Sequence, residues 1–174
     1  MFRFPYVLLI LIILVTSCSH SPKKVTSTNN FGMLDDSIVT YNQEIVKNED
    51  QSIFDFVSRY HWNMQKSSTG LRYLIYHKGK GPRAETGKVA VFNYSITLLN
   101  GDSCYSSKNE RPREMSLGRS ITERGLEEGL LLMNVGDRAK FIVPSHLAFG
   151  LLGDQKMIPP QATLVYDVEL INLK

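Results

Sequence analysis

The spacing of apolar residues changes twice along the chain. Residues 7–15 form an uninterrupted apolar run, apolar residues in 33–66 recur at intervals of three and four, and from residue 70 they alternate with polar ones. An interval of three or four predicts amphipathic helices, whereas alternation predicts strands. The pattern therefore predicts a helical segment over 33–66, followed by a domain of a different class over 67–174.

The helical segment carries two apolar stripes, each with the spacing of one helix face. The stripes are Leu34, Ile38, Tyr41 and Ile45, then Ile53, Phe54, Val57 and Tyr60. The polar residues 47–51 between them predict two short helices. Burying one Leu- or Phe-sized side chain is worth about 1.5–3 kcal/mol. We therefore expect the stripes to cover either the following domain or a second copy of the chain, as a homodimer through 33–66.

Residues 67–174 predict an α+β domain, in which an antiparallel sheet carries one helix on a face. The predicted strands are 71–76, 89–99, 102–107, 115–117, 138–144 and 163–173. Asn100-Gly101 is typical of a type I′ hairpin turn, and Ser120 with Glu123 has the spacing of a capping box. The helix that follows is expected to bury three apolar residues: Leu126, Leu130 and Met133.

The N-terminal apolar run is too short to span a bilayer, which needs about 20 residues, and it fits the core of a secretory signal. Residues 14–18 read Leu-Val-Thr-Ser-Cys and resemble a bacterial lipobox. We expect a signal peptide over 1–17, a lipid anchor on Cys18 and a flexible tether over 18–32. The alternatives are an ordinary signal peptide, or an N-terminal anchor that happens to end near a cysteine. Since no acidic residue closely follows Cys18, we expect an outer or inner membrane lipoprotein on the periplasmic side.

Composition narrows the function classes. The net charge of +3 is small for 174 residues and the basic residues are scattered, whereas nucleic-acid binding needs them clustered, so no nucleic-acid partner is expected. The four histidines lack metal-ligand spacing, and neither a metal nor a cofactor is expected. With Cys18 lipidated, Cys104 is the remaining thiol, so no intramolecular disulfide is expected. Glu127-Glu128 is interpreted as a solvated helix face.

A series of short motifs then follows in a recognisable order. They are Asn93-Tyr94, Leu99-Asn100-Gly101, 124–130 (RGLEEGL), 133–140 (MNVGDRAK), 147–150 (LAFG) and 158–170 (IPPQATLVYDVEL). On these motifs the chain from about residue 88 to 174 resembles the FKBP family of peptidyl-prolyl cis/trans isomerases. With the lipobox and the helical lead-in, the whole chain resembles the gliding-motility-associated FKBP-like lipoproteins of Bacteroidetes.

The resemblance implies a fold and a reaction. The fold is a half-open antiparallel sheet wrapped around one short helix, and the substrate is an X-Pro bond in a client protein. The barrier to rotation, about 18–20 kcal/mol, comes from amide resonance, so the reaction needs no nucleophile, metal or cofactor. A dry apolar pocket favours the twisted transition state, in which the amide has lost that resonance.

The resemblance also implies the positions of the site. Those expected to act in catalysis are Tyr94, Tyr105, Phe149 and Tyr166. Those expected to bind substrate are Cys104, Met115, Thr122, Glu123, Leu126, Met157 and Ile158. At Thr122 and Glu123 the family presents backbone groups, so their side chains are expected to matter less, and no charged side chain is expected to point inward. The alternative for Tyr94, Tyr166 and Leu126 is an ordinary core position.

Two departures from the family pattern leave two functional hypotheses open. Cys104-Tyr105 stands where the family has Phe-Asp, and Phe149 replaces a Tyr whose hydroxyl usually donates to a bound carbonyl. A shift of one residue would bring Tyr105 to the aromatic position, but it would also reverse the faces of the strand. The chain is therefore expected to be either an active isomerase that assists exported proteins near the membrane, or a low-turnover peptide-binding or scaffolding module.

Overall fold

The structure, a computed structural model, describes residues 30–109 and 111–174. The chain divides into two compact units, Met1–Ile38 and Val39–Lys174. The predicted signal peptide, the lipidation site Cys18 and residues 18–29 of the predicted tether lie outside the described residues. Among the residues that are described, no helix is long and apolar enough to cross a membrane.

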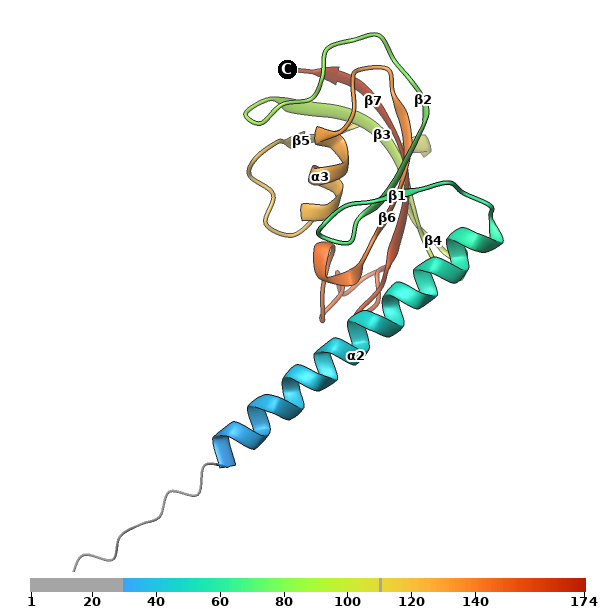
Figure 1. Cartoon of the computed structure of the whole chain (residues 1–174). Coiled ribbons are helices and arrows are strands. Elements are labelled where there is room, and N and C mark those ends of the chain that lie inside the picture. The colour runs from blue at the N-terminus through green and yellow to red at the C-terminus, as the bar shows by residue number, and fades with distance from the viewer. Residues whose placement is uncertain (1–29, 110) are drawn as a thin grey trace, which may run out of the picture. The chain divides into compact units, whose positions relative to one another are not determined.

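The predicted helical segment is one continuous helix, α2 (Asn30–Arg59), and not two (Figure 1). The prediction of two helices is wrong because residues 47–51 contain neither Gly nor Pro, and Lys, Glu and Gln are good helix formers. Two of their polar side chains, Glu49 and Asp50, instead face the domain. Asp50 pairs with Lys66 at 2.9 Å and with Arg72 at 2.8 Å. A polar interval in the stripe thus marks a contact with the domain and not a break in the helix.

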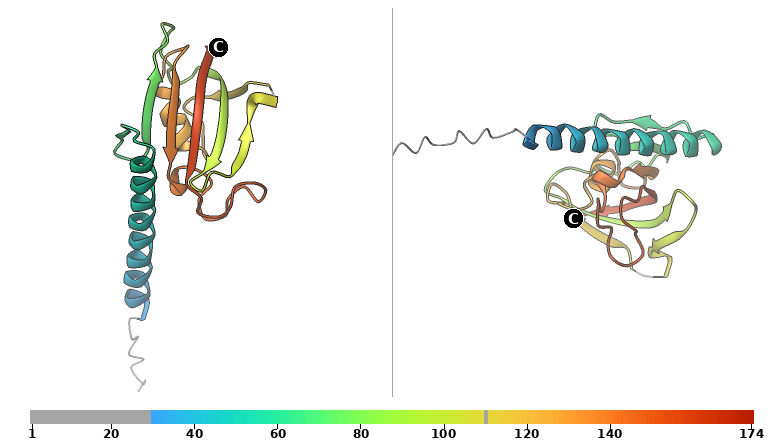
Figure 2. Two further views of the ribbon diagram at one scale, coloured as in Figure 1. Left: turned by 90° about the vertical axis from the view of Figure 1, so that its right-hand side faces the viewer. Right: turned by 90° about the horizontal axis from the view of Figure 1, so that it is seen from below.

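The second unit contains a single sheet in which all the strand pairings are antiparallel. Its strands are β1 (Gln65–Lys66), β2 (Arg72–His77), β3 (Val89–Leu98), β4 (Ser103–Ser106), β5 (Arg113–Ser116), β6 (Arg138–Val143) and β7 (Leu164–Leu173). Their order is β1-β2-β6-β7-β3-β4, and β5 also pairs with β3 (Figure 2). Short 3-10 turns cover Ser107–Asn109 and Ser145–Leu147.

The main core lies between the sheet and the short helix α3 (Arg124–Leu131), which packs on one face of the sheet (Figure 1). Its fully buried side chains alternate along the strands and recur on the helix: Phe92, Leu126, Leu130, Phe141 and Tyr166. Gly129 allows the close approach, because a Cβ there would lie 2.8 Å from the Phe141 ring. The predicted α+β fold class, with a helical segment ahead of the sheet, is confirmed by this architecture and by the similar structures described below.

The C-terminal part of α2 covers the opposite face of the sheet. Ile53 and Phe56 pack there against Ile142 and Val165, which alternate in sequence with the inward-facing Phe141 and Tyr166. The sequence left open whether the stripes cover the chain's own domain or a second copy of the chain. The second stripe covers the chain's own domain. The prediction that Phe54 belongs to this buried stripe is wrong, because Phe54 is 56% exposed. Phe56, which is 7% exposed, is buried there instead.

Two local features, the β3–β4 turn and the start of α3, differ from the sequence prediction. The β3–β4 turn is not type I′, because Gly101 has a positive φ of 95° whereas Asn100 does not. Gly101 N–H donates to the Leu98 carbonyl and Leu98 N–H to that of Asp102, the pattern of a three-residue loop with a bulge. The predicted capping box is not formed, because α3 begins at Arg124 with Glu123 as its N-cap. Ser120 lies before the helix, where its Oγ accepts from Glu123 N–H at 3.2 Å.

Candidate functional site

Six of the predicted site residues come from five parts of the second unit. Tyr94 lies on β3, Met115 on β5, Leu126 on α3 and Tyr166 on β7, and the β6–β7 loop brings Phe149 and Ile158. All six belong to the main core or pack against it. Two other predicted substrate-binding residues, Thr122 and Met157, are exposed. The sequence-predicted positions therefore gather around one apolar cluster, with Thr122 and Met157 outside it.

A charged group occupies this cluster. The Glu123 side chain, from a residue that is only 7% exposed, accepts from Arg113 Nη1 at 3.0 Å and forms a second bond with Nη2. The buried Tyr166 hydroxyl donates to the same carboxylate at 3.0 Å. The expectation that no charged side chain points inward is therefore wrong. The Glu123 side chain, expected to matter less than its backbone, forms the hydrogen bonds of this cluster.

Arg113 is the site residue that sequence reasoning missed. A signal existed, because alternate residues of a strand share a face, so a pocket position at Met115 places Arg113 on the same face of β5. The guanidinium carbon lies 5.9 Å from the centre of the Tyr94 ring. The Arg113 guanidinium thus lies near the ring of Tyr94, and Glu123 links it to the hydroxyl of Tyr166.

Burial and the ion pair together shift the pKa values of Tyr166 and Arg113. Burial, followed by the charge and the hydrogen bond of Glu123, raises the pKa of Tyr166 well above 10. The hydrogen bond to Glu123 raises the pKa of Arg113, although burial opposes it. Tyr166 is consequently neutral at physiological pH, and its hydroxyl donates its hydrogen bond to Glu123.

The departure at Cys104-Tyr105 is accommodated by a bulge. Tyr105 lies opposite Ile96 and Ser103 opposite Thr97, so Cys104 is the extra residue. Because a bulge inserts one residue without reversing the faces of the remaining strand, both Cys104 and Tyr105 pack against the main core. The open question of a one-residue shift is resolved in this way.

Cys104 and Tyr105 also attach β4 to the β6–β7 loop, 144–163. The Tyr105 hydroxyl donates to Asp154, and the Cys104 thiol donates to the Met157 carbonyl at 3.5 Å. Asp154 accepts further from the Ile158 N–H at 2.8 Å. Burial raises the pKa of Cys104, and the hydrogen bond to Asp154 raises that of Tyr105. Both groups are therefore neutral donors that hold the loop, and Tyr105 does not present its hydroxyl freely to the site.

Glu127 is more than the solvated residue that the sequence suggested. Its Oε1 accepts from the backbone N–H groups of Gly118, Arg119 and Ser120. The segment between β5 and α3 is therefore held over the first turn of the helix, next to Glu123. The negative charge lies near the N-terminus of α3, where it also suits the helix dipole.

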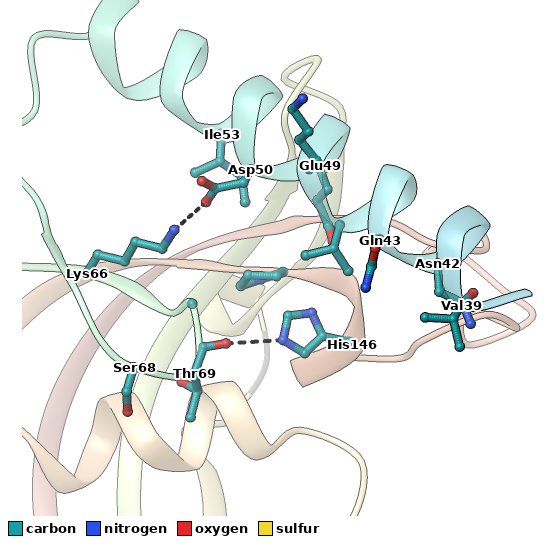
Figure 3. Close-up of a pocket in the computed structure, with 14 residues that line it drawn as sticks. Val39, Asn42, Gln43, Glu49, Asp50, Ile53, Lys66, Ser68, Thr69 and His146 are labelled. Atoms are coloured by element: carbon teal, nitrogen blue, oxygen red, sulfur yellow. Dashed lines mark hydrogen bonds and ion pairs between the residues drawn. The ribbon is translucent and has the colours of Figure 1, made fainter. Parts of the chain in front are cut away.

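A cavity of about 680 Å³ lies away from the predicted site, between α2 and the segments 66–70 and 144–146 (Figure 3). Val39, Val46 and Ile53 contribute its apolar side on α2. Across from them His146 Nε2 lies 3.1 Å from the Thr69 carbonyl oxygen. This cavity was not predicted from the sequence.

Comparison with known proteins identifies the family. Residues 81–171, more than half of the chain, match the sequence model of the FKBP-type peptidyl-prolyl cis-trans isomerases. The chain belongs to this family. The predicted family, the FKBP-type peptidyl-prolyl cis-trans isomerases, is confirmed.

Individual relatives agree with the family. FkpA of Escherichia coli (strain K12) is 35% identical over 111 residues, which cover 64% of this chain but 40% of that relative's length. The crystal structure of Escherichia coli FkpA is similar over 97% of this chain and 80% of its own, with a TM-score of 0.64 and 27% identity. The N-terminal domain of FKBP42 from Arabidopsis thaliana is similar over 65% and 93%, with a TM-score of 0.61 and 26% identity.

Proposed function

We propose that this FKBP-type isomerase acts on X-Pro bonds of exported proteins while a lipid on Cys18 tethers it to a membrane. The observation that carries the isomerase function is the gathering of Tyr94, Leu126, Ile158 and Tyr166 around one buried apolar cluster in a chain of this family. Apolar walls suit a prolyl ring and exclude the water that stabilises the resonant ground state of the amide. Uncatalysed isomerisation takes tens to hundreds of seconds, so even modest catalysis is measurable.

The test is the isomerisation rate of a short peptide with an apolar residue before proline. We expect the mature chain at micromolar concentration to exceed the uncatalysed rate, and Tyr94→Ala to reduce that excess. Tyr41→Ala is the matched control, since Tyr41 is 62% exposed on α2. A wild-type protein that leaves the uncatalysed rate unchanged contradicts the proposal.

A second candidate function is a low-turnover peptide-binding or scaffolding module. Two observations favour it: the Arg113–Glu123 pair replaces apolar lining within the site, and Tyr105 is occupied by Asp154. The two candidate functions are distinguished directly. A binding module should bind proline peptides in a fluorescence titration without accelerating their isomerisation.

The membrane tether rests on the lipobox-like residues 14–18. More than one acyl chain on Cys18 would make the attachment stable. We expect Cys18→Ala to move the protein from the membrane fraction to the soluble fraction, and we expect added protease to spare the wild type in intact cells. The periplasmic side and a link to gliding motility are part of the proposal, the latter motivated by resemblance alone. Retention of the Cys18→Ala variant in the membrane fraction contradicts it.

A homodimer through 33–66 remains part of the proposal. Its motive is the apolar surface that α2 exposes in the second unit, at Val39 (49%), Tyr41 (62%) and Val46 (51%). The other part of α2 is used within the chain, because Ile53 and Phe56 pack on the sheet. The stretch 39–46 of α2, in which Val39 and Val46 also line the cavity, is therefore the part available to a second copy.

A further inference from the structure

One carboxylate of α2 contacts both ends of the β6–β7 loop. Glu49 Oε1 accepts from Ser145 N–H at 2.7 Å and from the Thr163 hydroxyl at 2.6 Å. Glu49 Oε2 also accepts from the Ser145 hydroxyl at 3.1 Å. Ser145 and Thr163 are each only 7% exposed. Three donors from two distant points of the chain therefore converge on one side chain of the helix.

These contacts continue into the part of the loop that carries the site. The Ser145 carbonyl accepts from Gly150 N–H at 2.9 Å, and the Gly150 carbonyl accepts from Gln161 N–H at 2.9 Å. Phe149 lies between Ser145 and Gly150. A chain of hydrogen bonds thus runs from Glu49 through the turn that places Phe149 to the far side of the loop.

The rest of the loop is held differently. Asp154 and Met157 are bonded to β4 through Tyr105 and Cys104, so the tip is attached to the sheet. Only the base, next to Ser145 and Thr163, is attached to α2 through Glu49. The two ends of the loop already meet where Val143 pairs with Leu164. The strand pairing therefore keeps the two ends of the loop close, whereas Glu49 can affect the direction in which the loop leaves the sheet.

We propose that Glu49 is a positioning residue of the isomerase site, and that α2 is a working part of the isomerase unit although it lies outside residues 81–171 that match the family. This rests on the proposed function. Glu49 touches no substrate; it holds the base of the loop that presents Phe149 and Ile158. Loss of the acceptor leaves two buried donor residues unsatisfied, and a buried donor without a partner drives the local structure to rearrange.

The neighbouring residue provides a matched control. Asp50 also attaches α2 to the domain, but through Lys66 and Arg72 on β1 and β2. Glu49→Ala and Asp50→Ala thus both weaken the attachment of the helix, and only the first removes an acceptor from the loop. Glu49→Gln is the conservative variant, since its amide oxygen keeps one acceptor for Ser145 and Thr163.

The experiment measures KM, kcat and amide hydrogen exchange on the full-length chain. For Glu49→Ala we expect KM to rise roughly tenfold, the fold-change that corresponds to about 1.4 kcal/mol, with a smaller change in kcat. Exchange at Gly150 and Gln161 should accelerate by a similar factor. Asp50→Ala should lower the melting temperature without either effect, and Glu49→Gln should recover part of the loss.

Parallel changes in Glu49→Ala and Asp50→Ala would overturn the proposal, because they would show that α2 acts only through overall stability. Should Glu49→Ala fail to fold, Thr163→Val removes one of the same bonds from the loop side, and we expect it to accelerate exchange at Gln161. Absence of isomerase activity in the wild type would refute the proposed function alone. The exchange contrast between the two alanine variants would still decide whether Glu49 positions the loop.

Discussion

Removal of Arg113 alone from the Arg113–Glu123 pair is expected to lower the free energy of unfolding much more than removal of both partners. The Glu123 side chain is 9% exposed and that of Arg113 is 34% exposed, so the two single variants are not equivalent. Arg113→Met leaves a buried carboxylate with only the Tyr166 hydroxyl as a donor. Glu123→Leu leaves a guanidinium that can turn toward water.

The magnitudes follow from these exposures. Breaking a buried pair by removing one partner costs about 3–5 kcal/mol, and Arg113→Met should lie near the lower end because its own side chain is partly hydrated. At about 2–4 °C per kcal/mol for a chain of this size, its melting temperature should fall by roughly 10 °C. Glu123→Leu should cost about 1–2 kcal/mol. The double variant should lie within about 1 kcal/mol of the wild type, since apolar replacements of a buried pair are often neutral.

The assay is urea unfolding followed by circular dichroism, with equal m-values as the condition for comparing free energies. Arg138→Met is the control, because the Arg138–Glu169 pair is exposed (53% and 37%) and should contribute less than about 1 kcal/mol. If Arg113→Met costs no more than this control, or if the two single costs simply add in the double variant, the reasoning about the buried charge is refuted. The double variant should also isomerise proline peptides faster, because its pocket is apolar.

Three further outcomes are expected. Leu130→Ala, at a fully buried position of α3, should lower the free energy of unfolding by about 2–5 kcal/mol, whereas Leu151→Ala, 71% exposed, should change it by less than about 0.5 kcal/mol. Burial and the hydrogen bond to Asp167 raise the pKa of Tyr76 to about 12. Because Tyr76 ionises at lower pH in the unfolded chain, the free energy of unfolding should fall as pH rises from 10 to 12. A Tyr76→Phe variant that shows the same fall in denaturant titrations would disprove this assignment. Light scattering on residues 33–174 should report a dimer, and a monomer mass at tens of micromolar rules the dimer out.

Local patterns along the chain predicted the main strands and the buried face of α3 well. Alternation over 89–99 and 163–173 corresponds to β3 and β7, and the helix predicted to bury Leu126 and Leu130 does so. These elements are predictable because burial on one face of a strand or helix imposes a period on its own residues.

The helical segment shows where this reasoning fails. Residues 47–51 interrupt an apolar stripe, and the sequence interpretation placed a break there. The interruption exists because Glu49 and Asp50 meet partners on distant elements, among them Ser145 and Arg72. A period reports only that a position is buried against something apolar, so a polar contact to the domain is indistinguishable from a loop.

By itself the sequence determined the family, the α+β class and many of the apolar residues of the main core, because each of these is recorded in local spacing or in motifs. Only the tertiary structure decided that Arg113 and Glu123 form an ion pair within the site, that a bulge turns both Cys104 and Tyr105 toward the core, and that Glu49 holds the β6–β7 loop. Each of these depends on which charged or hydrogen-bonding group lies opposite another across elements. Side-chain pairing of that kind has no characteristic spacing, since it is set by the register and packing of elements far apart along the chain.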